Sequence, residues 1–207
     1  MAEARDTGGV RMVRADRLRP FVRSLFTAVG VPDADAETVA EVLVEADLRG
    51  VESHGTTRVA GYVSMIKGGL LNPKPTVEVF RDTPSTAMLE GDRAFGIVVA
   101  TRALRLAICK AARAGVACVT ARNVTHTGMA INVETFMPLA EFGARVDRLI
   151  GHVKSSAPAP GVEELFVAGE LEFRRQAERA RDGIPLSQVV CRELERLAAE
   201  HGIRCEF

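Results

Sequence analysis

The chain has 207 residues, of which 47% are hydrophobic and 26% are charged, a composition typical of a globular protein with one sizeable core or two small ones. Lys and Arg together number 27, as do Asp and Glu, so the formal net charge is zero and we expect neither nucleic acid nor an anionic membrane surface as a partner. No apolar stretch approaches the roughly 20 residues of a membrane span, and four cysteines without CxxC spacing favour a reducing, cytoplasmic compartment.

The first part of the chain is predicted to be helical after a polar arm. Residues 1–15 contain no apolar segment and are expected to be a flexible arm. Apolar residues then recur every three or four positions from Asp16 to Gly30, and again in a segment that ends near Gly50, which predicts two amphipathic helices. A third helix is predicted to end at Lys67, before a pair of glycines.

The middle of the chain combines strand and helix patterns. Residues 76–80 and 86–89 are β-prone runs separated by turn residues, the spacing of a hairpin. A long helix is predicted to end at Gly115, directly before the apolar run 116–120, which is typical of a buried strand. Residues 130–133 are expected to form a further short strand.

The last third is expected to be mainly helical. Pro138 occupies the first turn of a helix with a regular apolar stripe that reaches Val153. Residues 165–167 are expected as a strand, 171–181 as a charged helix and 187–200 as a final helix. The predicted fold class is therefore α/β of the α+β type, rich in helix, with a helical N-terminal part, a short sheet and C-terminal helices.

One short segment carries several chemically useful side chains. At the entrance of the third predicted helix, the sequence places Ser53, His54 and Arg58 around a glycine. Histidine suits proton transfer in both directions near neutral pH, and a guanidinium can hold a carboxylate through two hydrogen bonds. This pair suits a hydroxy or oxo acid. The alternative is a partly buried turn histidine, a capping hydroxyl and a solvated helix charge, because this spacing is common on helices.

A second polar cluster follows the predicted buried strand. It runs from Asn123 to Gly128 and contains His126, which could deliver another imidazole to the same cleft. The alternative is an ordinary solvated loop histidine.

Longer runs of residues resemble a known family. The run from Ala46 to Gly55 resembles the amino-terminal signature of the malate/L-lactate dehydrogenase family, which includes ureidoglycolate dehydrogenase and diketogulonate reductase, and residues 179–186 are similar to the family's carboxyl end. Other matching positions are Arg58, Gly61, Tyr62, Gly68-Gly69, Asn72-Pro73, Gly91-Asp92, Gly96, Gly115-Val116, the Asn123–Gly128 loop, Phe136-Met137-Pro138, Phe142, Arg145-Val146-Asp147 and Ala168-Gly169-Glu170. The resemblance extends from Asp16 to Ile203.

The resemblance is interrupted at one point. Between Gly128 and Ile131 the family ordinarily continues through a long central portion with most of its cofactor cleft, and that portion is missing here. The expected organisation is an N-terminal helical and substrate part (16–128) and a C-terminal strand and helix part (129–207), without the nucleotide-binding portion. The family's fold is not of the Rossmann type, so the resemblance implies no GxGxxG motif.

The resemblance also implies roles for individual residues. His54 and His126 would lie in the active site, one as proton donor or acceptor and the other positioning substrate, while Ser53 and Arg58 would touch the substrate. NAD or NADP would lie beside Ala168, Gly169 and Glu170. The implied substrate is a small 2-hydroxy or 2-oxo acid, and no metal is expected.

Three functional hypotheses follow. The first is an NAD(P)-dependent oxidoreductase that transfers hydride between nicotinamide and such an acid. The second is a cofactor-independent acid/base enzyme acting on a small oxo acid. The third is a non-catalytic, dimerising relative. In each case a homodimer is expected, since losing the central portion exposes apolar faces that a second subunit can cover.

Overall fold

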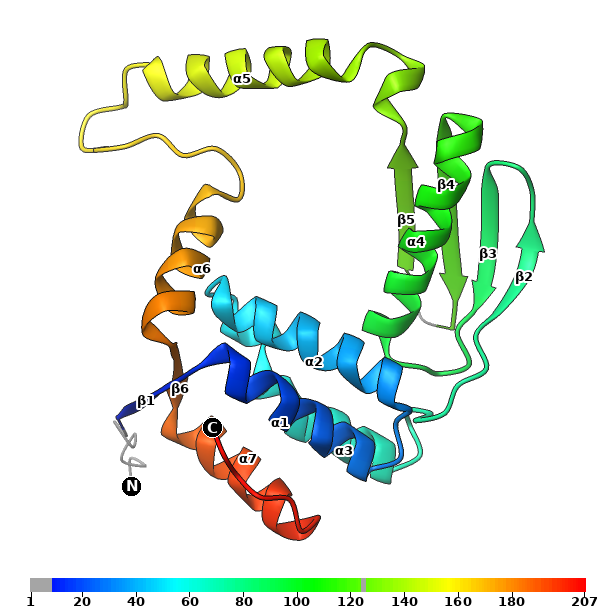
Figure 1. The fold of residues 1–207 in the computed structure, drawn as a ribbon, viewed down its shortest axis with the longest axis vertical. Coiled ribbons are helices and arrows are strands. Elements are labelled where there is room, and N and C mark those ends of the chain that lie inside the picture. Colours follow the sequence, from blue (N-terminus) through cyan, green and yellow to red (C-terminus); the bar gives the residue numbers. More distant parts are fainter. Residues whose placement is uncertain (1–8, 124–125) are drawn as a thin grey trace. The chain divides into compact units, whose positions relative to one another are not determined.

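The computed structural model describes residues 9–123 and 126–207. Its contacts divide the chain into two compact units, of which unit 1 comprises Met1–Lys74 with Glu172–Phe207 and unit 2 comprises Pro75–Leu171. Figure 1 shows the elements in chain order. The expected boundary at 128/129 falls inside a strand of unit 2 that pairs with its neighbour, so it does not separate two units.

Helices make up most of unit 1, as the sequence predicts. They are α1 (Ala15–Ala28), α2 (Asp33–Leu48), α3 (Val59–Lys67) and α7 (Gln188–Glu200). The apolar stripe of α1 is buried, and α1 packs along α2. The charged helix α6 (Glu170–Asp182) begins at the boundary between the units and has no buried residue.

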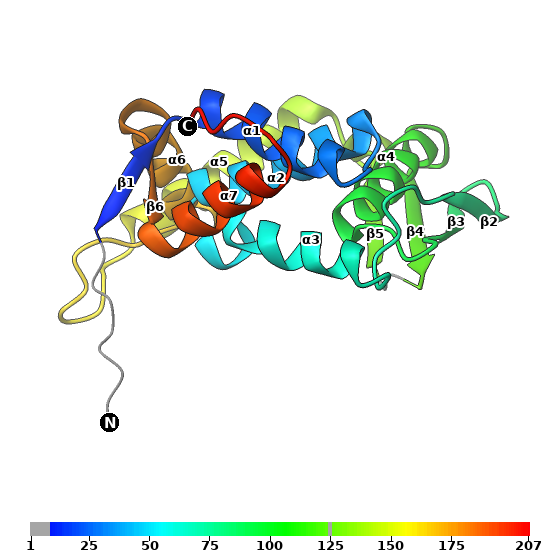
Figure 2. The same ribbon diagram turned by 90° about the horizontal axis from the view of Figure 1, so that it is seen from below.

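A two-stranded sheet joins the two distant segments of unit 1. Strand β1 (Val10–Val13) pairs antiparallel with β6 (Ile184–Ser187), and the two strands lie side by side in Figure 2. Val13 opposes Ile184, and both side chains are buried. Of the arm expected over residues 1–15, residues 1–8 lie outside the described residues, whereas residues 10–13 form a strand that this contact and the pairing with β6 hold in place.

Unit 2 contains a four-stranded sheet in the order β2-β3-β4-β5. Strands β2 (Glu78–Asp82) and β3 (Thr86–Glu90) form the predicted hairpin, and β4 (Val116–Arg122) is the predicted buried strand. Strand β3 runs parallel to β4, and the long helix α4 (Gly96–Ala114) makes the crossover that a parallel pair requires. Strand β5 (His126–Ile131) runs antiparallel to β4 at the edge.

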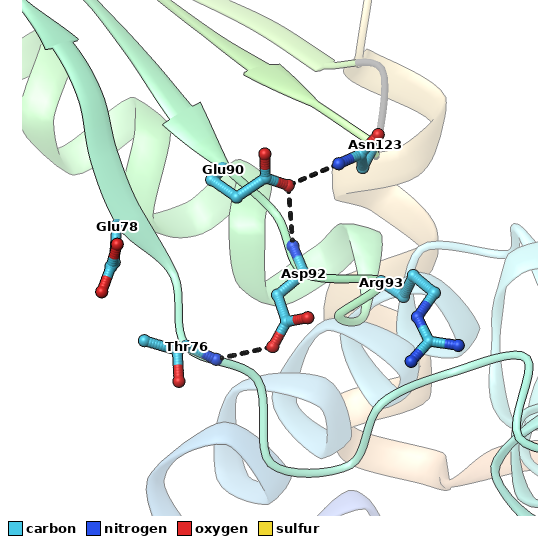
Figure 3. Close-up of a pocket in the computed structure, with 6 residues that line it drawn as sticks. All are labelled: Thr76, Glu78, Glu90, Asp92, Arg93 and Asn123. Carbon is cyan, nitrogen blue, oxygen red and sulfur yellow. Dashed lines mark hydrogen bonds between the residues drawn. The ribbon is translucent and has the colours of Figure 1, made fainter.

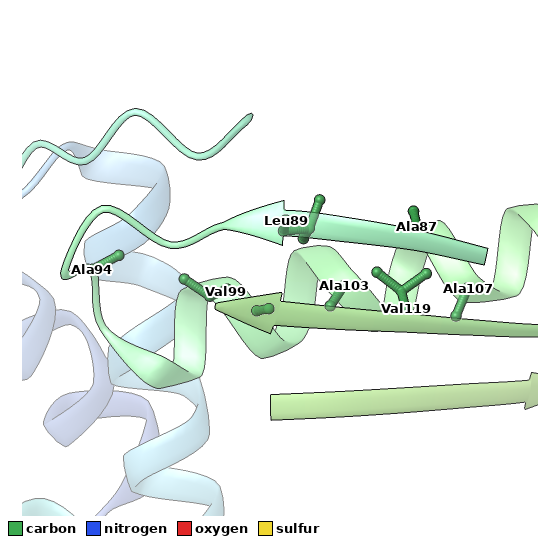
Figure 4. Packing of buried hydrophobic residues seen from close by; sticks show 8 residues of the cluster. Ala87, Leu89, Ala94, Val99, Ala103, Ala107 and Val119 are labelled. Atoms are coloured by element: carbon green, nitrogen blue, oxygen red, sulfur yellow. The ribbon is translucent and has the colours of Figure 1, made fainter. Parts of the chain in front are cut away.

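The core of unit 2 lies between this sheet and α4. Alternate residues of β4 point inward, and Val119 packs with Ala103 and Ala107 of the helix and with Leu89 of β3 (Figure 4). Small alanine side chains let the helix approach the sheet closely. The sheet thus has one face covered by α4.

The remaining segments of unit 2 differ in part from expectation. Helix α5 (Leu139–Ser155) is confirmed, but none of its residues is buried, so its apolar stripe is exposed. The strand predicted over 165–167 is wrong, because no neighbouring strand pairs with it among the described residues. The short strand expected over 130–133 instead starts at His126 and gives way to the 3-10 turn η3 (Val133–Thr135). In the described ranges, no helix is long and apolar enough to cross a membrane.

Candidate functional site

The Ser53–His54 segment forms a compact turn between α2 and α3. It consists of two short 3-10 turns, η1 (Glu52–His54) and η2 (Thr56–Arg58). The hydroxyl of Ser53 lies 2.9 Å from Nδ1 of His54, and both residues are exposed. The sequence-predicted acid/base residue is therefore at the surface, with one ring nitrogen engaged.

Arg58 lies one turn further along the chain. Its guanidinium carbon is 5.7 Å from the centre of the Tyr62 ring, within the range of a cation–π contact. Arg58 is exposed, so its charge is accessible to an anion in solution.

A buried carboxylate, that of Asp47, stabilises the turn through its contact with Thr56. Asp47, near the end of α2, is only 1% exposed, and its Oδ2 accepts hydrogen bonds from the backbone N–H (2.8 Å) and the hydroxyl (2.6 Å) of Thr56. Burial raises the pKa of Asp47, while the two hydrogen bonds from Thr56 oppose that shift. The contact fixes η2 against the end of α2.

Gly55 makes this close contact possible. A Cβ atom at Gly55 would lie 1.7 Å from Oδ1 of Asp47, which is far inside van der Waals contact. Only a residue without a side chain fits between the two 3-10 turns here.

Arg179 of α6 holds the same turn from another side. It donates to the backbone carbonyl of Asp47 (2.5 Å) and to the carboxylate of Glu52 (2.6 Å). The hydrogen bond from Arg179 lowers the pKa of Glu52. Asp47, Gly55 and Arg179 together define the backbone around Ser53 and His54.

A cavity of about 320 Å³ adjoins this turn within unit 1. Ser53 lines the cavity, while His54 and Arg58 do not. The full lining is Val10, Asp47, Glu52, Ser53, Thr56, Thr57, Pro185, Leu186, Ser187 and Val190. The cavity thus brings the β1–β6 ribbon, which the sequence did not predict, next to the predicted substrate residue Ser53.

Unit 2 has a more polar cavity of about 620 Å³. Its lining residues come from the carboxyl ends of the parallel strands β3 and β4 and from the chain next to them, and are Thr76, Glu78, Glu90, Asp92, Arg93 and Asn123 (Figure 3). The carboxylate of Glu90 accepts from the Asn123 amide (2.6 Å) and the Asp92 N–H (3.2 Å), and the Asn123 bond is the largest cause that lowers its pKa. In α/β sheets this edge often binds ligands.

Backbone strain is concentrated in the same cavity. Asp92 (φ 46°), Arg93 (φ 55°) and Asn123 (φ 63°) have positive φ angles although none is glycine. Asn and Asp tolerate this region better than Arg does, and such strain costs about 1–3 kcal/mol for a residue. The hydrogen bonds of Glu90 and of Asp92, which accepts from the Thr76 N–H at 3.0 Å, hold these residues in place.

His126 is the first residue of β5. It opposes Ala121 of β4 and is exposed. Two other residues of the predicted cluster, Val124 and Thr125, lie outside the described residues. His126 is in unit 2 and His54 is in unit 1, so their meeting in one active site stays a prediction.

The segment expected to contact the nucleotide forms a turn before α6. Gly169 has a φ of 85°, and the carboxylate of Glu170 accepts from the N–H of Val167 (3.1 Å) and from the ammonium of Lys154 (2.9 Å). These hydrogen bonds connect the start of helix α6 to the end of helix α5. Neither Glu170 nor its two neighbours Ala168 and Gly169 line the cavities described above.

Asp47 and Arg179 are the site residues that sequence reasoning missed. The buried positions of α2 include Ala36, Val39 and Leu43, and Asp47 continues that stripe with a carboxylate. A charged residue on an apolar stripe needs a buried partner, and this was the available signal. In the part of the chain that the structure describes, no group of His, Cys, Asp and Glu is arranged to hold a metal ion.

Comparison with known proteins identifies the family. The family model for malate/L-lactate dehydrogenase matches residues 13–131 and 129–195, so the chain belongs to this family. The two matched segments meet at 129–131, where the central portion is missing from the sequence resemblance.

Individual relatives agree with this assignment. The chain is 35% identical over 192 residues to a malate dehydrogenase of Pyrococcus abyssi, and this match covers 81% of the chain. It is 38% identical over 119 residues to an L-sulfolactate dehydrogenase of Methanocaldococcus jannaschii, a match that covers 58% of this chain and 35% of the relative. The solved malate dehydrogenase of Pyrococcus horikoshii superposes with a TM-score of 0.91 at 23% identity, covering 100% of this chain and 99% of that chain, which shows the same fold. By sequence, the chain spans about half the length of the malate dehydrogenases it matches, 53% and 54%.

Proposed function

We propose that this chain carries the acid-binding and proton-transfer part of a 2-hydroxy-acid dehydrogenase, acting on a small 2-hydroxy or 2-oxo acid with NAD or NADP as hydride carrier. The observation that carries the proposal is the anchored Ser53–His54 turn. A general acid or base must be held in a defined orientation, and Asp47 and Gly55 supply that for this turn. The family membership and the names of the relatives supply the reaction class.

The hydrogen bond between Ser53 and His54 suggests how the proton is handled. In the imidazolium form of His54, Nδ1–H donates to the Ser53 hydroxyl oxygen and Nε2–H can donate its proton to the oxygen of a 2-oxo acid, which leaves a neutral imidazole with its proton on Nδ1. In the reverse direction the unprotonated Nε2 of this neutral imidazole accepts the hydroxyl proton of a 2-hydroxy acid. We assign His54 as the proton donor and acceptor, and His126 as the second imidazole, which positions substrate.

Arg58 is the proposed partner of the substrate carboxylate. Its exposed guanidinium lies on the same short segment as His54, and stacking on Tyr62 limits its orientations. A planar guanidinium can bind both carboxylate oxygens, which a lysine cannot. Ser53, which lines the cavity of unit 1, is the proposed second polar contact to the substrate.

The residues proposed for the nucleotide do not by themselves fit a dinucleotide. Such a ligand needs a concave pocket that buries most of its surface. Ala168 and Gly169 line neither cavity described above, and the Glu170 carboxylate is engaged by Lys154. We therefore assign no step of the reaction to a bound nicotinamide, although these three residues remain the proposed contacts of NAD or NADP.

The poor fit of these residues to a dinucleotide favours a second candidate function, that of a cofactor-independent acid/base enzyme. A chain that binds an oxo acid without holding a nicotinamide can still catalyse proton exchange at the carbon next to the carbonyl. The observation in its favour is that the chain spans only 53% of its malate dehydrogenase relative. In this case His54 acts as the base, and no hydride is transferred.

One set of experiments separates these candidates. Titration calorimetry of the purified chain with a 2-oxo dicarboxylic acid is expected to detect binding, and Arg58→Leu is expected to weaken it about 10- to 100-fold, the value of one charge-assisted pair. Arg17→Leu, an exposed arginine on α1, is the matched control and should leave affinity unchanged. Absence of binding to the unsubstituted chain would refute both candidates.

The reaction type is then read from two signals. Oxidation of NADH that needs the oxo acid and is lost in His54→Ala supports the dehydrogenase. Deuterium uptake from solvent into the acid without NADH, again lost in His54→Ala, supports the cofactor-independent enzyme instead. Deuterium uptake that persists in His54→Ala removes the basis of the second candidate.

We also propose a reducing compartment, the cytoplasm, as the location. All four cysteines are free thiols in the structure, and Cys191 is buried in unit 1. Burial raises the pKa of Cys191, which keeps its thiol protonated and unreactive. Thiol titration with and without a reductant in cell extracts tests this proposal, since oxidised cysteines in the native protein would contradict it.

A further inference from the structure

The outer edge of β5 is an unprotected sheet edge. Strand β5 is the last strand of the sheet in unit 2, and its six residues contain no Asp, Glu, Lys or Arg, no proline and no irregularity in its register with β4. Sheet edges in soluble proteins normally carry one of these features, because an open row of backbone groups pairs readily with another strand.

The opposite edge of the same sheet shows the contrast. Strand β2 carries Glu78, Arg81 and Asp82 among its five residues, and its register with β3 shifts between Val79 and Arg81. These are the usual means of preventing edge pairing. One edge of the sheet is therefore protected and the other is not.

The backbone pattern shows which groups of β5 face outward. The N–H of Asn132 donates to the carbonyl of Gly115 (2.7 Å), one position beyond the pair Val116 and Ile131. Since hydrogen-bonded pairs alternate along an antiparallel ladder, the backbone groups of Thr127, Met129 and Ile131 point away from β4. Among the described residues, no backbone partner is found for these outward groups.

The side chains beside this edge are apolar and exposed. Met129 is 61% and Ile131 is 58% exposed, on the sheet face opposite α4, since Ala130 between them packs against the core on the side of that helix. On the α4 side, a cavity of about 350 Å³ runs between Ile108 and the end of β5. Apolar surface thus flanks the open edge on both faces, which is typical of an interface.

We propose that two copies of this chain pair through β5, antiparallel and edge to edge, so that their sheets join into one. The join lies next to residues 129–131, where the two matched segments of the family meet. A second copy fits this edge because the strand carries no Asp, Glu, Lys or Arg that would repel its own copy, and an antiparallel strand is complementary to itself under a two-fold axis. This inference does not depend on the proposed chemistry.

The outward groups fix the register of the pair. Antiparallel hydrogen bonding requires outward residues of one strand to oppose outward residues of the other. With the two-fold axis at Met129, this residue opposes its own copy, and Thr127 opposes Ile131 in both directions, so all three outward residues are paired. Shifting the axis to Gly128 or Ala130 places one of the three opposite a residue outside β5.

Charge substitution at Met129 tests both the surface and the register. Met129→Lys and Met129→Glu each place like charges opposite one another, which destabilises a cross-strand pair. We expect the unsubstituted chain to sediment as a dimer, each variant alone to sediment as a monomer of 22.3 kDa, and an equimolar mixture of the two to sediment as a dimer again. Met129 is exposed, so circular dichroism spectra should be unchanged.

Val79→Lys is the matched control. Val79 is 52% exposed on β2, the opposite edge of the same sheet, and its substitution should leave the dimer intact. A monomeric unsubstituted chain at tens of micromolar, whatever other protein it binds, overturns the proposal. So does a dimer that persists in both Met129 variants, or a mixture that stays monomeric.

Discussion

Gly55 lies so close to Asp47 that the carboxylate of Asp47 occupies the space where a side chain on Gly55 would be. The distance from a Cβ at Gly55 to Oδ1 of Asp47 would be 1.7 Å, and the other carboxylate oxygen is held by Thr56. The geometry of the Ser53–His54 turn thus depends on a residue that contributes no chemical group of its own.

Replacing Gly55 by alanine is expected to destabilise the protein. The added methyl group forces Asp47 away from Thr56, and overpacking of this kind costs about 1–3 kcal/mol. Urea unfolding measures the change. Gly61→Ala is the control, because Gly61 lies in α3 and a Cβ atom added there would have no other atom within 4 Å, so alanine should stabilise the helix by about 0.5–1 kcal/mol. Equal effects of the two substitutions would contradict the proposed contact.

The raised pKa of Asp47 gives stability a definite pH dependence. Burial favours the protonated carboxyl in the folded state, so the folded pKa lies above the ordinary value of 3.8. In the window between those two values the folded state binds more protons than the unfolded state, and the free energy of unfolding falls as pH rises. Asp47→Asn, which keeps an acceptor for Thr56 but cannot ionise, should lack this fall.

Urea unfolding between about pH 3.5 and pH 8, with both proteins measured in parallel, checks this expectation. Only the difference between them is informative, because other carboxyl groups titrate in the same range. Glu52 affects stability with the opposite dependence on pH. Arg179 lowers the pKa of Glu52, so the stabilisation from this carboxylate is fully present above its ordinary pKa of 4.5 and is lost as pH falls through the lowered pKa. A difference between the Asp47 proteins that does not change with pH would contradict the assignment.

Substitution of Arg179 is expected to lower the stability of the protein more than substitution of the nearby Arg181 on α6. Arg179→Met removes the charged donor to the carbonyl of Asp47 and to the carboxylate of Glu52, and a hydrogen bond to a charged group contributes about 1.5–3 kcal/mol. The Gly50 N–H still donates to the Asp47 carbonyl in this variant. Arg181→Met is the matched control, since Arg181 is 74% exposed and bonds to the adjacent Asp182, and it should change stability by less than about 0.5 kcal/mol. Thermal unfolding distinguishes the two, and a smaller effect at Arg179 would be inconsistent with its anchoring role.

Gly115 is expected to resist substitution for a conformational reason. It ends α4 with a φ of 82°, and a Cβ there would lie 2.9 Å from Cγ2 of Thr135. Gly115→Ala should cost at least about 1–2 kcal/mol, the usual penalty of the left-handed conformation. Gly128→Ala is the comparison, because its nearest neighbour would be Leu104 at an ordinary 3.7 Å, and we expect it to be neutral or slightly stabilising in urea unfolding.

The sequence predicted the helices well because their pattern is local. The stripe that includes Leu18 and Leu25 is enough to define α1, and Gly115 is enough to end α4. Pairing between distant segments leaves no such pattern. Val10–Val13 carries no sign of its partner Ile184–Ser187, so the ribbon was missed. Residues 165–167 have the composition of a strand, but no strand in the described part of the chain pairs with them.

The candidate site shows the same division. Residue types and their close spacing were enough to single out Ser53, His54 and Arg58. The support from Asp47 and Arg179 was not predicted, because their contacts join helices whose packing the sequence does not specify. Likewise, the relation of His54 to His126 depends on two units that no local pattern connects.

The pairing of β1 with β6 has a consequence for how the chain acquires its structure during synthesis. Unit 1 needs its last segment to complete its ribbon, whereas unit 2 is one uninterrupted stretch. On the ribosome, which releases the chain from the N-terminus onward, unit 2 can therefore finish folding while the first helices still await residues 184–187. Until that strand emerges, the apolar surface beneath Val13 is open to solvent and is the part of the nascent chain that a chaperone would be expected to shield.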